Sequence, residues 1–177
     1  MRDATAASPP LRLFLALWPD DAVRDGIRAW QQAWQWPRGA RLVPPERLHL
    51  TLHFIGNVPP ARLPALARGL RVEFEAIDIV YGDGAVWPGG IAVLRPARTP
   101  DTLARLHARL AVALGALELP VESRAFRAHV TLARRASGAV PPPGSPALAW
   151  RAAGGYVLVR SLGGGAGYRI VERFSPS

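Results

Sequence analysis

The chain has 177 residues, of which 49% are hydrophobic and 20% charged, a composition typical of a folded protein with one sizeable core. It contains no Cys, which excludes disulfides, thiolate catalysis and cysteine-ligated metals. The formal net charge of +9 comes from Arg alone, because no Lys is present, and indicates either an anionic partner or a bias in amino-acid usage.

Nothing in the sequence predicts a membrane protein. No apolar run reaches the roughly 20 residues that a membrane helix needs. The segment from Met1 to Pro10 contains an early Asp3 and no apolar centre, so it does not resemble a secretion signal. We therefore expect a cytoplasmic protein without a membrane anchor.

The first part of the chain predicts two strands, each followed by a helix. Residues 11–18 form a short apolar run typical of a strand. A helix is expected over residues 20–36, with an Asp as its N-cap and with Trp30 and Trp34 on its buried stripe. A second strand is predicted over residues 48–55 and a second helix over residues 60–70.

The second part predicts further strands around one more helix. That helix opens at Thr99-Pro100, where the missing N–H of Pro does no harm, and a Leu stripe follows it. A Gly-Asp-Gly turn and a Trp-Pro-Gly-Gly turn are expected between the strands that precede it. The strands are predicted over residues 76–80, 90–94, 128–133, 156–159 and 168–171, the last two as a hairpin around three successive glycines.

A strand, a helix and a second strand occur twice in this order. The second strand of the first unit carries His49, and that of the second unit carries His129, 80 residues later (129 − 49). A duplicated unit would place the two histidines at equivalent points of two similar lobes, and hence in one cleft. Ordinary alternation of strands and helices can produce such a repeated order without a duplication.

Both histidines stand in the same motif, His-x-Thr. The first is His49-Leu50-Thr51 and the second His129-Val130-Thr131. Side chains alternate across a strand, so His and Thr at positions i and i+2 share a face. In the first strand the opposite face is expected to carry apolar residues up to Phe54, so each strand would turn its His/Thr pair towards a cleft.

These residue types suit the opening of a cyclic phosphate by water. One base must activate the water and one acid must protonate the departing ribose oxygen, and imidazole can do either near neutral pH. The Thr hydroxyls can donate to phosphate oxygens as charge shifts in the transition state. This chemistry requires neither a metal nor a cofactor.

The two motifs and their flanks resemble the paired signatures of the two-histidine phosphoesterases. The matching stretches are residues 46–56, Glu-Arg-Leu-His-Leu-Thr-Leu-His-Phe-Ile-Gly, and residues 126–134, Phe-Arg-Ala-His-Val-Thr-Leu-Ala-Arg. The branch most similar is that of the RNA 2′,3′-cyclic phosphodiesterases, also called LigT-like or 2′-5′ RNA ligase family proteins. The opening strand, the triple proline and the closing hairpin resemble that branch too. One departure is Ala128, where this branch usually has Pro.

The resemblance implies a bilobal α+β fold. Two antiparallel sheets related by a pseudo-twofold axis would face a central cleft, with helices on the outside and residues 1–177 forming a single domain of two intertwined lobes. His49 and His129 would be the acid/base pair, and Thr51, Thr131 and Arg134 would bind the phosphate. The expected activity is hydrolysis of RNA 2′,3′-cyclic phosphate ends to 2′-phosphomonoesters by a monomer without ATP, and reversible 2′-5′ ligation is a second reaction that the resemblance allows.

Other residues near the motifs attract attention. His53 forms His-x3-His with His49, but four residues of strand span roughly 13 Å, too far for one metal ion. His53 should instead share the face of His49 and line the cleft rim. Trp18 and Tyr168, together with Trp87, are candidates for stacking on RNA bases, and His107 is expected at the surface.

Two alternatives to an RNA-end phosphodiesterase stay open at this point. One is an enzyme for small cyclic phosphates such as cyclic nucleotides. The other is a non-catalytic RNA-binding module that keeps the cleft as a scaffold, although both His and both Thr are present.

Overall fold

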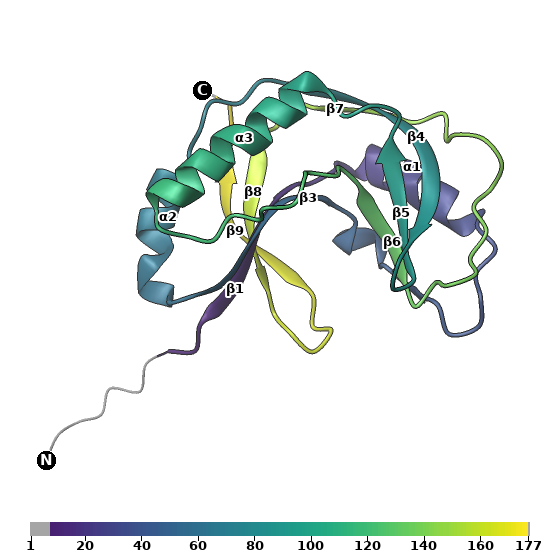
Figure 1. Ribbon diagram of the computed structural model, residues 1–177, viewed down its shortest axis with the longest axis horizontal. Helices are drawn as coiled ribbons and strands as arrows, with labels where there is room; N and C mark the ends of the chain where they lie inside the picture. The colour runs from purple at the N-terminus through teal and green to yellow at the C-terminus, as the bar shows by residue number, and fades with distance from the viewer. Residues whose placement is uncertain (1–7, 177) are drawn as a thin grey trace, which may run out of the picture.

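The computed structural model describes residues 8–176 and has the expected α+β class (Figure 1). Residues 1–7, most of the N-terminal segment discussed above, lie outside the described residues. The elements are β1 (Leu11–Leu17), α1 (Asp21–Gln32), β2 (Arg41–Leu42), β3 (Leu50–Val58), α2 (Leu63–Gly69), β4 (Ile77–Trp87), β5 (Ile91–Pro96), α3 (Asp101–Ala116), β6 (Val130–Arg134), β7 (Ala149–Ala152), β8 (Tyr156–Ser161) and β9 (Tyr168–Phe174).

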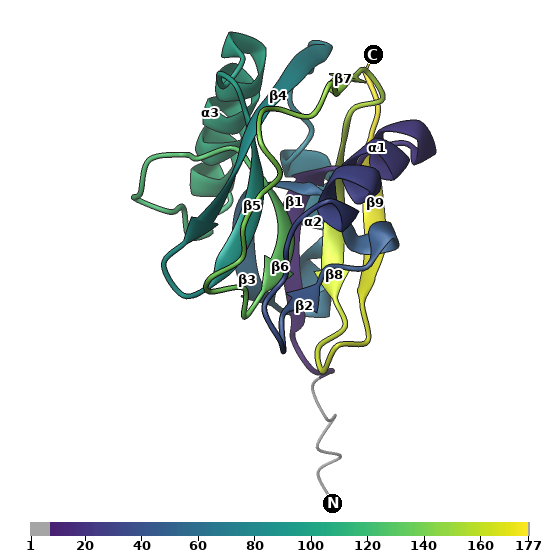
Figure 2. The ribbon, with the colours of Figure 1, turned by 90° about the vertical axis from the view of Figure 1, so that its right-hand side faces the viewer.

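The strands form one curled antiparallel sheet in the order β7-β4-β5-β6-β3-β1-β8-β9, with β2 beside β6. The sheet has two halves of four strands, which Figure 1 shows side by side, and in Figure 2 the half with β4, β5 and β6 faces the viewer. Only the pair Leu50 and Val130 joins β3 to β6. The two predicted sheets are therefore two halves of one sheet, which meet where the two motif-bearing strands begin.

The predicted repeat is visible in the topology. In each half the leading strand lies next to the strand that follows a motif histidine: β1 pairs with β3, and β5 pairs with β6. The helix of each unit lies between those strands in the sequence. The two histidines thus occupy equivalent positions at the junction of the halves.

The helices α1 and α3 each pack on the half of the sheet that does not contain the strand before them. The helix α1 follows β1, yet Trp30 of α1 packs against Gly84 of β4, and the Gln31 side chain of α1 donates to the Leu132 carbonyl of β6 at 2.7 Å. The helix α3 follows β5, yet it packs against β3 through His107, beside α2 (Figure 1). This exchange interlocks the two halves.

One predicted turn is wrong. Residues 82–84, Gly-Asp-Gly, do not turn the chain but lie within the long strand β4, at an irregularity in its pairing with β5. A Cβ at Gly82 would stand 2.7 Å from the Cα of Ala97, and one at Gly84 would collide with Trp34. These glycines therefore allow close approach rather than a reversal. The chain reverses at the Trp-Pro-Gly-Gly turn, as expected.

The strand β3 contains two irregularities that change which side chains face the cleft. Thr51 pairs with Ala16, but the next pairs are His53 with Leu15 and Phe54 with Phe14. Paired residues share a face of the sheet. His53 therefore lies with the core side chain Leu15, and Phe54 lies on the opposite, concave face.

Among the helices in the described part of the chain, none has the length and apolar character needed to cross a membrane.

Candidate active site

His49 and His129 each stand one residue before a strand, at the junction of the two halves of the sheet. A single helical turn, Pro45–Arg47, leads into His49. Leu50 and Val130, the residues that follow the histidines, are the pair that joins β3 to β6. The backbone therefore brings the two imidazoles to one place although 80 residues separate them.

Both rings are held by the same hydrogen bond. Nδ1 of His49 lies 2.6 Å from the carbonyl of Arg47, and Nδ1 of His129 lies 2.6 Å from the carbonyl of Arg127. A carbonyl can only accept, so Nδ1 carries the proton in each ring and Nε2 is the nitrogen left for chemistry. Nε2 of His49 lies 3.1 Å from the Thr51 hydroxyl, which donates to it when the ring is neutral.

Three aromatic rings surround His49. The Trp18 indole stacks on it with ring centroids 5.1 Å apart and planes 4° from parallel. Phe14 lies at 5.0 Å, and Tyr168 meets the ring edge-on at 5.3 Å. These contacts fix the plane of the imidazole and exclude water from much of it.

His129 has a more open and more cationic environment. The centroid of the Trp87 ring lies 4.5 Å from that of the His129 ring. The Arg127 guanidinium stacks on the Trp87 ring, 4.3 Å from its centroid. The two histidines therefore have the same backbone anchor and different neighbours.

A cleft of about 370 Å³ lies between the two motifs. It contains His49, His129, Thr51, Thr131 and Arg134, so all five predicted catalytic and phosphate-binding residues lie around one space. Arg134 stands at the end of β6, exposed but within the cleft lining. The other lining residues are Val43, Arg47, Phe54, Trp87, Ile91, Arg124 and Tyr168.

Burial favours the neutral form of both imidazoles. Burial lowers the pKa of His49 from 6.5 to about 4; the Arg47 carbonyl opposes this shift, and the charges of His129 and Arg134 add to it. Burial also lowers the pKa of His129, against the Arg127 carbonyl and with the charges of Arg127 and Arg134. An anion bound between the rings would raise both pKa values, because it favours the protonated form.

The prediction that His53 lines the cleft rim is wrong. Its side chain is buried on the core face, where Nε2 lies 2.8 Å from the His107 carbonyl. His107 was expected at the surface, yet its ring stacks between His53, at 3.9 Å, and Phe126, at 4.0 Å. These two histidines link α3 to β3, and neither lines the cleft between the motifs. His107 does line a neighbouring cavity of about 410 Å³, whose wall also includes Thr51 and His129.

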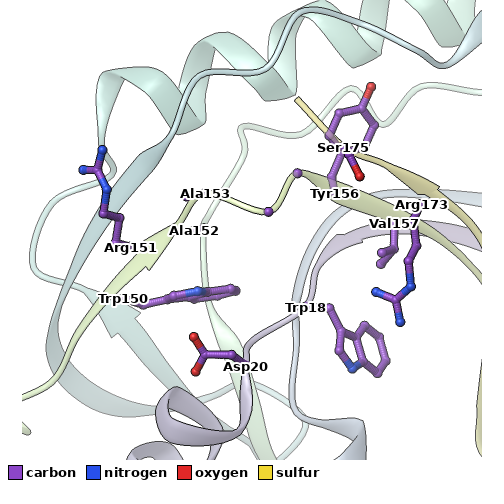
Figure 3. Close-up of a pocket in the computed structure, with 12 residues that line it drawn as sticks. Trp18, Asp20, Trp150, Arg151, Ala152, Ala153, Tyr156, Val157, Arg173 and Ser175 are labelled. Carbon is purple, nitrogen blue, oxygen red and sulfur yellow. The ribbon is translucent and has the colours of Figure 1, made fainter. Parts of the chain in front are cut away.

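Of the three stacking candidates, Trp18 and Tyr168 contact His49, and Trp87 contacts His129. One face of Trp18 is already occupied by the imidazole, and the same indole borders a second cavity of about 350 Å³ (Figure 3). In that cavity Arg151 is paired with Asp78, and Asp20 caps the first turn of α1. Tyr168 is 39% exposed and lines the cleft itself, so its ring offers a free surface there.

Sequence reasoning missed several cleft residues. Phe54 was expected on the apolar face, but its side chain is 53% exposed and lines the cleft. Arg47 and Arg124 were not singled out, because one lies in the turn before a motif and the other in an irregular segment. The position of Arg47 two residues before His49 was the only available signal. Over residues 8–176, no group of three or more His, Cys, Asp or Glu side chains is arranged to hold a metal ion.

Comparisons with known proteins agree with the geometry. Residues 17–90 match the family model described as LigT like phosphoesterase. An RNA 2′,3′-cyclic phosphodiesterase of Thermus thermophilus is 34% identical over 93% of this chain and 90% of its own length. One of Escherichia coli is 31% identical over 77% of this chain and 80% of its own length. The crystal structure of E. coli LigT in apo form superposes with a TM-score of 0.84 at 26% identity, covering 96% of this chain and 99% of that chain.

Proposed function

Since the chain belongs to the LigT-like phosphoesterase family, we propose that it is an RNA 2′,3′-cyclic phosphodiesterase that converts cyclic phosphate ends into 2′-phosphomonoesters. The relatives that bear this name cover most of the chain.

One observation supports this reaction above all. Two imidazoles, each with Nδ1 held on the carbonyl two residues earlier, leave their Nε2 atoms to a shared cleft that also contains two Thr hydroxyls and an Arg. Opening a cyclic phosphate requires a base on one side of phosphorus and an acid on the other. Two histidines contributed by opposite halves of the sheet meet that demand.

We assign the roles as follows. Nε2 of His129 accepts a proton from water, whose oxygen attacks phosphorus while the P–O3′ bond breaks. The bound phosphate favours the protonated form of His49. Nε2 of that protonated ring gives its proton to the departing O3′, and the phosphate stays on O2′. Thr51, Thr131 and Arg134 hold the non-bridging oxygens, and Arg can hold two of them at once.

The role of each histidine can be tested with a leaving group that needs no proton. A cyclic phosphate with sulfur in place of O3′ should restore the activity of His49→Ala and leave His129→Ala inactive. Rescue of His129→Ala alone would mean that the two roles are exchanged.

The surroundings of the cleft favour RNA as the substrate. Arg47 and Arg134 supply positive charge, whereas Arg124 is paired with Glu122. The exposed rings of Phe54 and Tyr168 supply surfaces for base stacking. All of these residues come from one chain. The proposed unit is therefore a monomer that forms a single two-histidine phosphoesterase domain, and we propose that it works in the cytoplasm. Neither ATP nor a metal enters the proposed reaction.

The experiment uses an RNA oligomer with a 2′,3′-cyclic phosphate, in EDTA, with the product identified by ³¹P NMR. The expected product is the 2′-phosphomonoester, formed at the same rate with and without EDTA. Hydrolysis of free nucleoside cyclic phosphates but not of the oligomer would favour the small-molecule alternative. Tight RNA binding without turnover would favour the non-catalytic one. A separate incubation of RNA with a 2′,3′-cyclic phosphate end and RNA with a 5′-hydroxyl end would reveal 2′-5′ ligation.

A further inference from the structure

A smaller cavity of about 220 Å³ adjoins the cleft beside the β8–β9 hairpin. We call it the hairpin cavity. Arg47 and Tyr168 line both spaces, so the hairpin cavity lies next to the cleft. Its lining consists of Arg12, Arg47, Ser161, Gly163, Gly164, Gly165, Gly167 and Tyr168.

Strand register places Arg12 on the same face as the catalytic cleft. Arg12 of β1 pairs with Ser161 of β8, and Ser161 pairs with Tyr168 of β9. Paired residues share a face, so the three side chains form a row on the concave face. Tyr168, at the end of this row, also meets the His49 ring at 5.3 Å.

The charge of the hairpin cavity is entirely positive. Its lining contains two arginines and no Asp or Glu. Within residues 8–176, neither Arg12 nor Arg47 forms an ion pair with a carboxylate. The cavity in Figure 3 differs, because Asp20 lies in its wall and Arg151 is paired.

The hairpin tip adds backbone donors. Gly163, Gly164 and Gly165 all have positive φ, between 53° and 80°, which favours glycine. The backbone bonds of the tip use the N–H groups of Leu162 and Ala166, so the three glycine N–H groups make no such bond within the described residues. Arg47 fixes the tip by donating to the Gly165 carbonyl at 2.8 Å. Successive N–H groups in a turn of this kind form an anion-binding concavity.

We propose that the hairpin cavity is a second phosphate subsite, which binds a backbone phosphodiester upstream of the cyclic end of the RNA. This inference rests on the proposed function, and it makes the substrate an oligonucleotide rather than a mononucleotide. Arg12 and the glycine tip hold the upstream phosphate, and Tyr168 stands between that phosphate and the reacting one.

The test compares two RNA trinucleotides that both end in a 2′,3′-cyclic phosphate. One has ordinary phosphodiester linkages, and the other has uncharged methylphosphonate linkages. The reacting group is the same in both, so the ratio of their kcat/KM values reports only the upstream charge. For the wild-type protein we expect the charged trimer to react about tenfold faster than the neutral one.

Arg12→Gln should bring this ratio close to one. It should also reduce the slope of log kcat/KM against log salt concentration for the charged trimer by roughly 0.7. Arg12→Lys, which keeps the charge, should retain most of the ratio. Arg169→Gln is the matched control: Arg169 is exposed on the same hairpin and pairs with Arg160, one residue from the concave row, so it should keep the wild-type ratio.

A wild-type ratio near one would overturn the inference, and so would an Arg12→Gln variant that keeps the wild-type ratio or an Arg169→Gln variant that loses it equally. In each case hydrolysis of both trimers would leave the proposed function intact. Failure to hydrolyse either trimer or a nucleoside 2′,3′-cyclic phosphate would reject the proposed function itself. Circular dichroism of each variant checks that it is folded.

Discussion

Identical backbone anchors hold His49 and His129, but different neighbours set their chemistry. Each Nδ1 is bound to the carbonyl two residues earlier at 2.6 Å, so tautomer and ring position are fixed in the same way. Three aromatic rings then enclose His49, whereas Trp87 and Arg127 flank His129. Near-equivalent positions in the two halves can therefore support unequal roles in one reaction.

If the two histidines act as one acid/base pair, His49→Ala and His129→Ala should each lower kcat by roughly 10²–10⁴. The double variant should lose far less than the product of the two losses, because either change already breaks the pair. Steady-state kinetics on a cyclic-phosphate oligomer measures this. Near-normal turnover of either single variant would remove that histidine from the mechanism.

The lowered histidine pKa values predict an acid-shifted pH profile. The profile of kcat/KM reports the free protein, which must hold one histidine protonated and the other neutral. Since the pKa of His49 is about 4 and that of His129 lies below 6.5, kcat/KM should peak between these values and fall as pH rises above 6.5. The profile of kcat should peak at higher pH, because the bound phosphate raises both pKa values. Coincident profiles would contradict this account.

At the scale of single elements, the sequence predicted most of the strands and helices and the meeting of the five site residues. Alternation along a strand was sufficient for the two His-x-Thr motifs, because each motif spans only three residues. It failed at His53 and Phe54, since the irregular pairing of β3 with β1 reverses which of them faces the core. Such irregularities depend on the partner strand, which is not visible in the local sequence. The short strands β2 and β7 were missed for the same reason.

The buried histidine stack predicts a stability effect. Burial lowers the pKa of His53, against the His107 carbonyl and the charge of Glu122. Burial and the charge of His53 lower the pKa of His107 to about 4, against the charge of Glu122. Near and below pH 6.5 these two imidazoles therefore bind protons more readily in the unfolded chain than in the folded chain, so the free energy of unfolding falls on acidification. His107→Phe keeps an aromatic ring between His53 and Phe126 and should reduce the loss of stability between pH 7 and pH 5.

Urea midpoints at the two pH values measure this change. Val112→Phe is the control, because Val112 lies on the same helix and is 75% exposed, outside the stack. It should keep the wild-type pH dependence. An unchanged dependence in His107→Phe would show that the stack does not contribute to acid sensitivity.

For the whole molecule, the exchange of α1 and α3 between the two halves predicts that they unfold together. Neither half retains its covering helix if the other half opens. Calorimetry should therefore give one transition, with equal calorimetric and van't Hoff enthalpies. Two transitions would contradict a single domain.

Gly84→Ala tests the same coupling by a local change. Its Cβ would collide with Trp34 and Trp30, at a typical cost of about 1–3 kcal/mol for overpacking, and should lower the Tm of the whole chain in one step. Gly115→Ala is the matched control, since no atom lies within 4 Å of its added Cβ in helix α3. It should leave the Tm unchanged or raise it. A Gly84→Ala variant that splits the transition would show that the halves are separable.

The position of β1 also has a consequence during synthesis on the ribosome. β1 lies between β3 and β8, and β8 is made about 100 residues after β3. At ordinary elongation rates, the edge of β1 that pairs with β8 stays unpaired for roughly 5–20 s after β3 has been made. Throughout that interval the nascent chain exposes an apolar strand edge, which makes it a substrate for ribosome-associated chaperones until the C-terminal hairpin emerges.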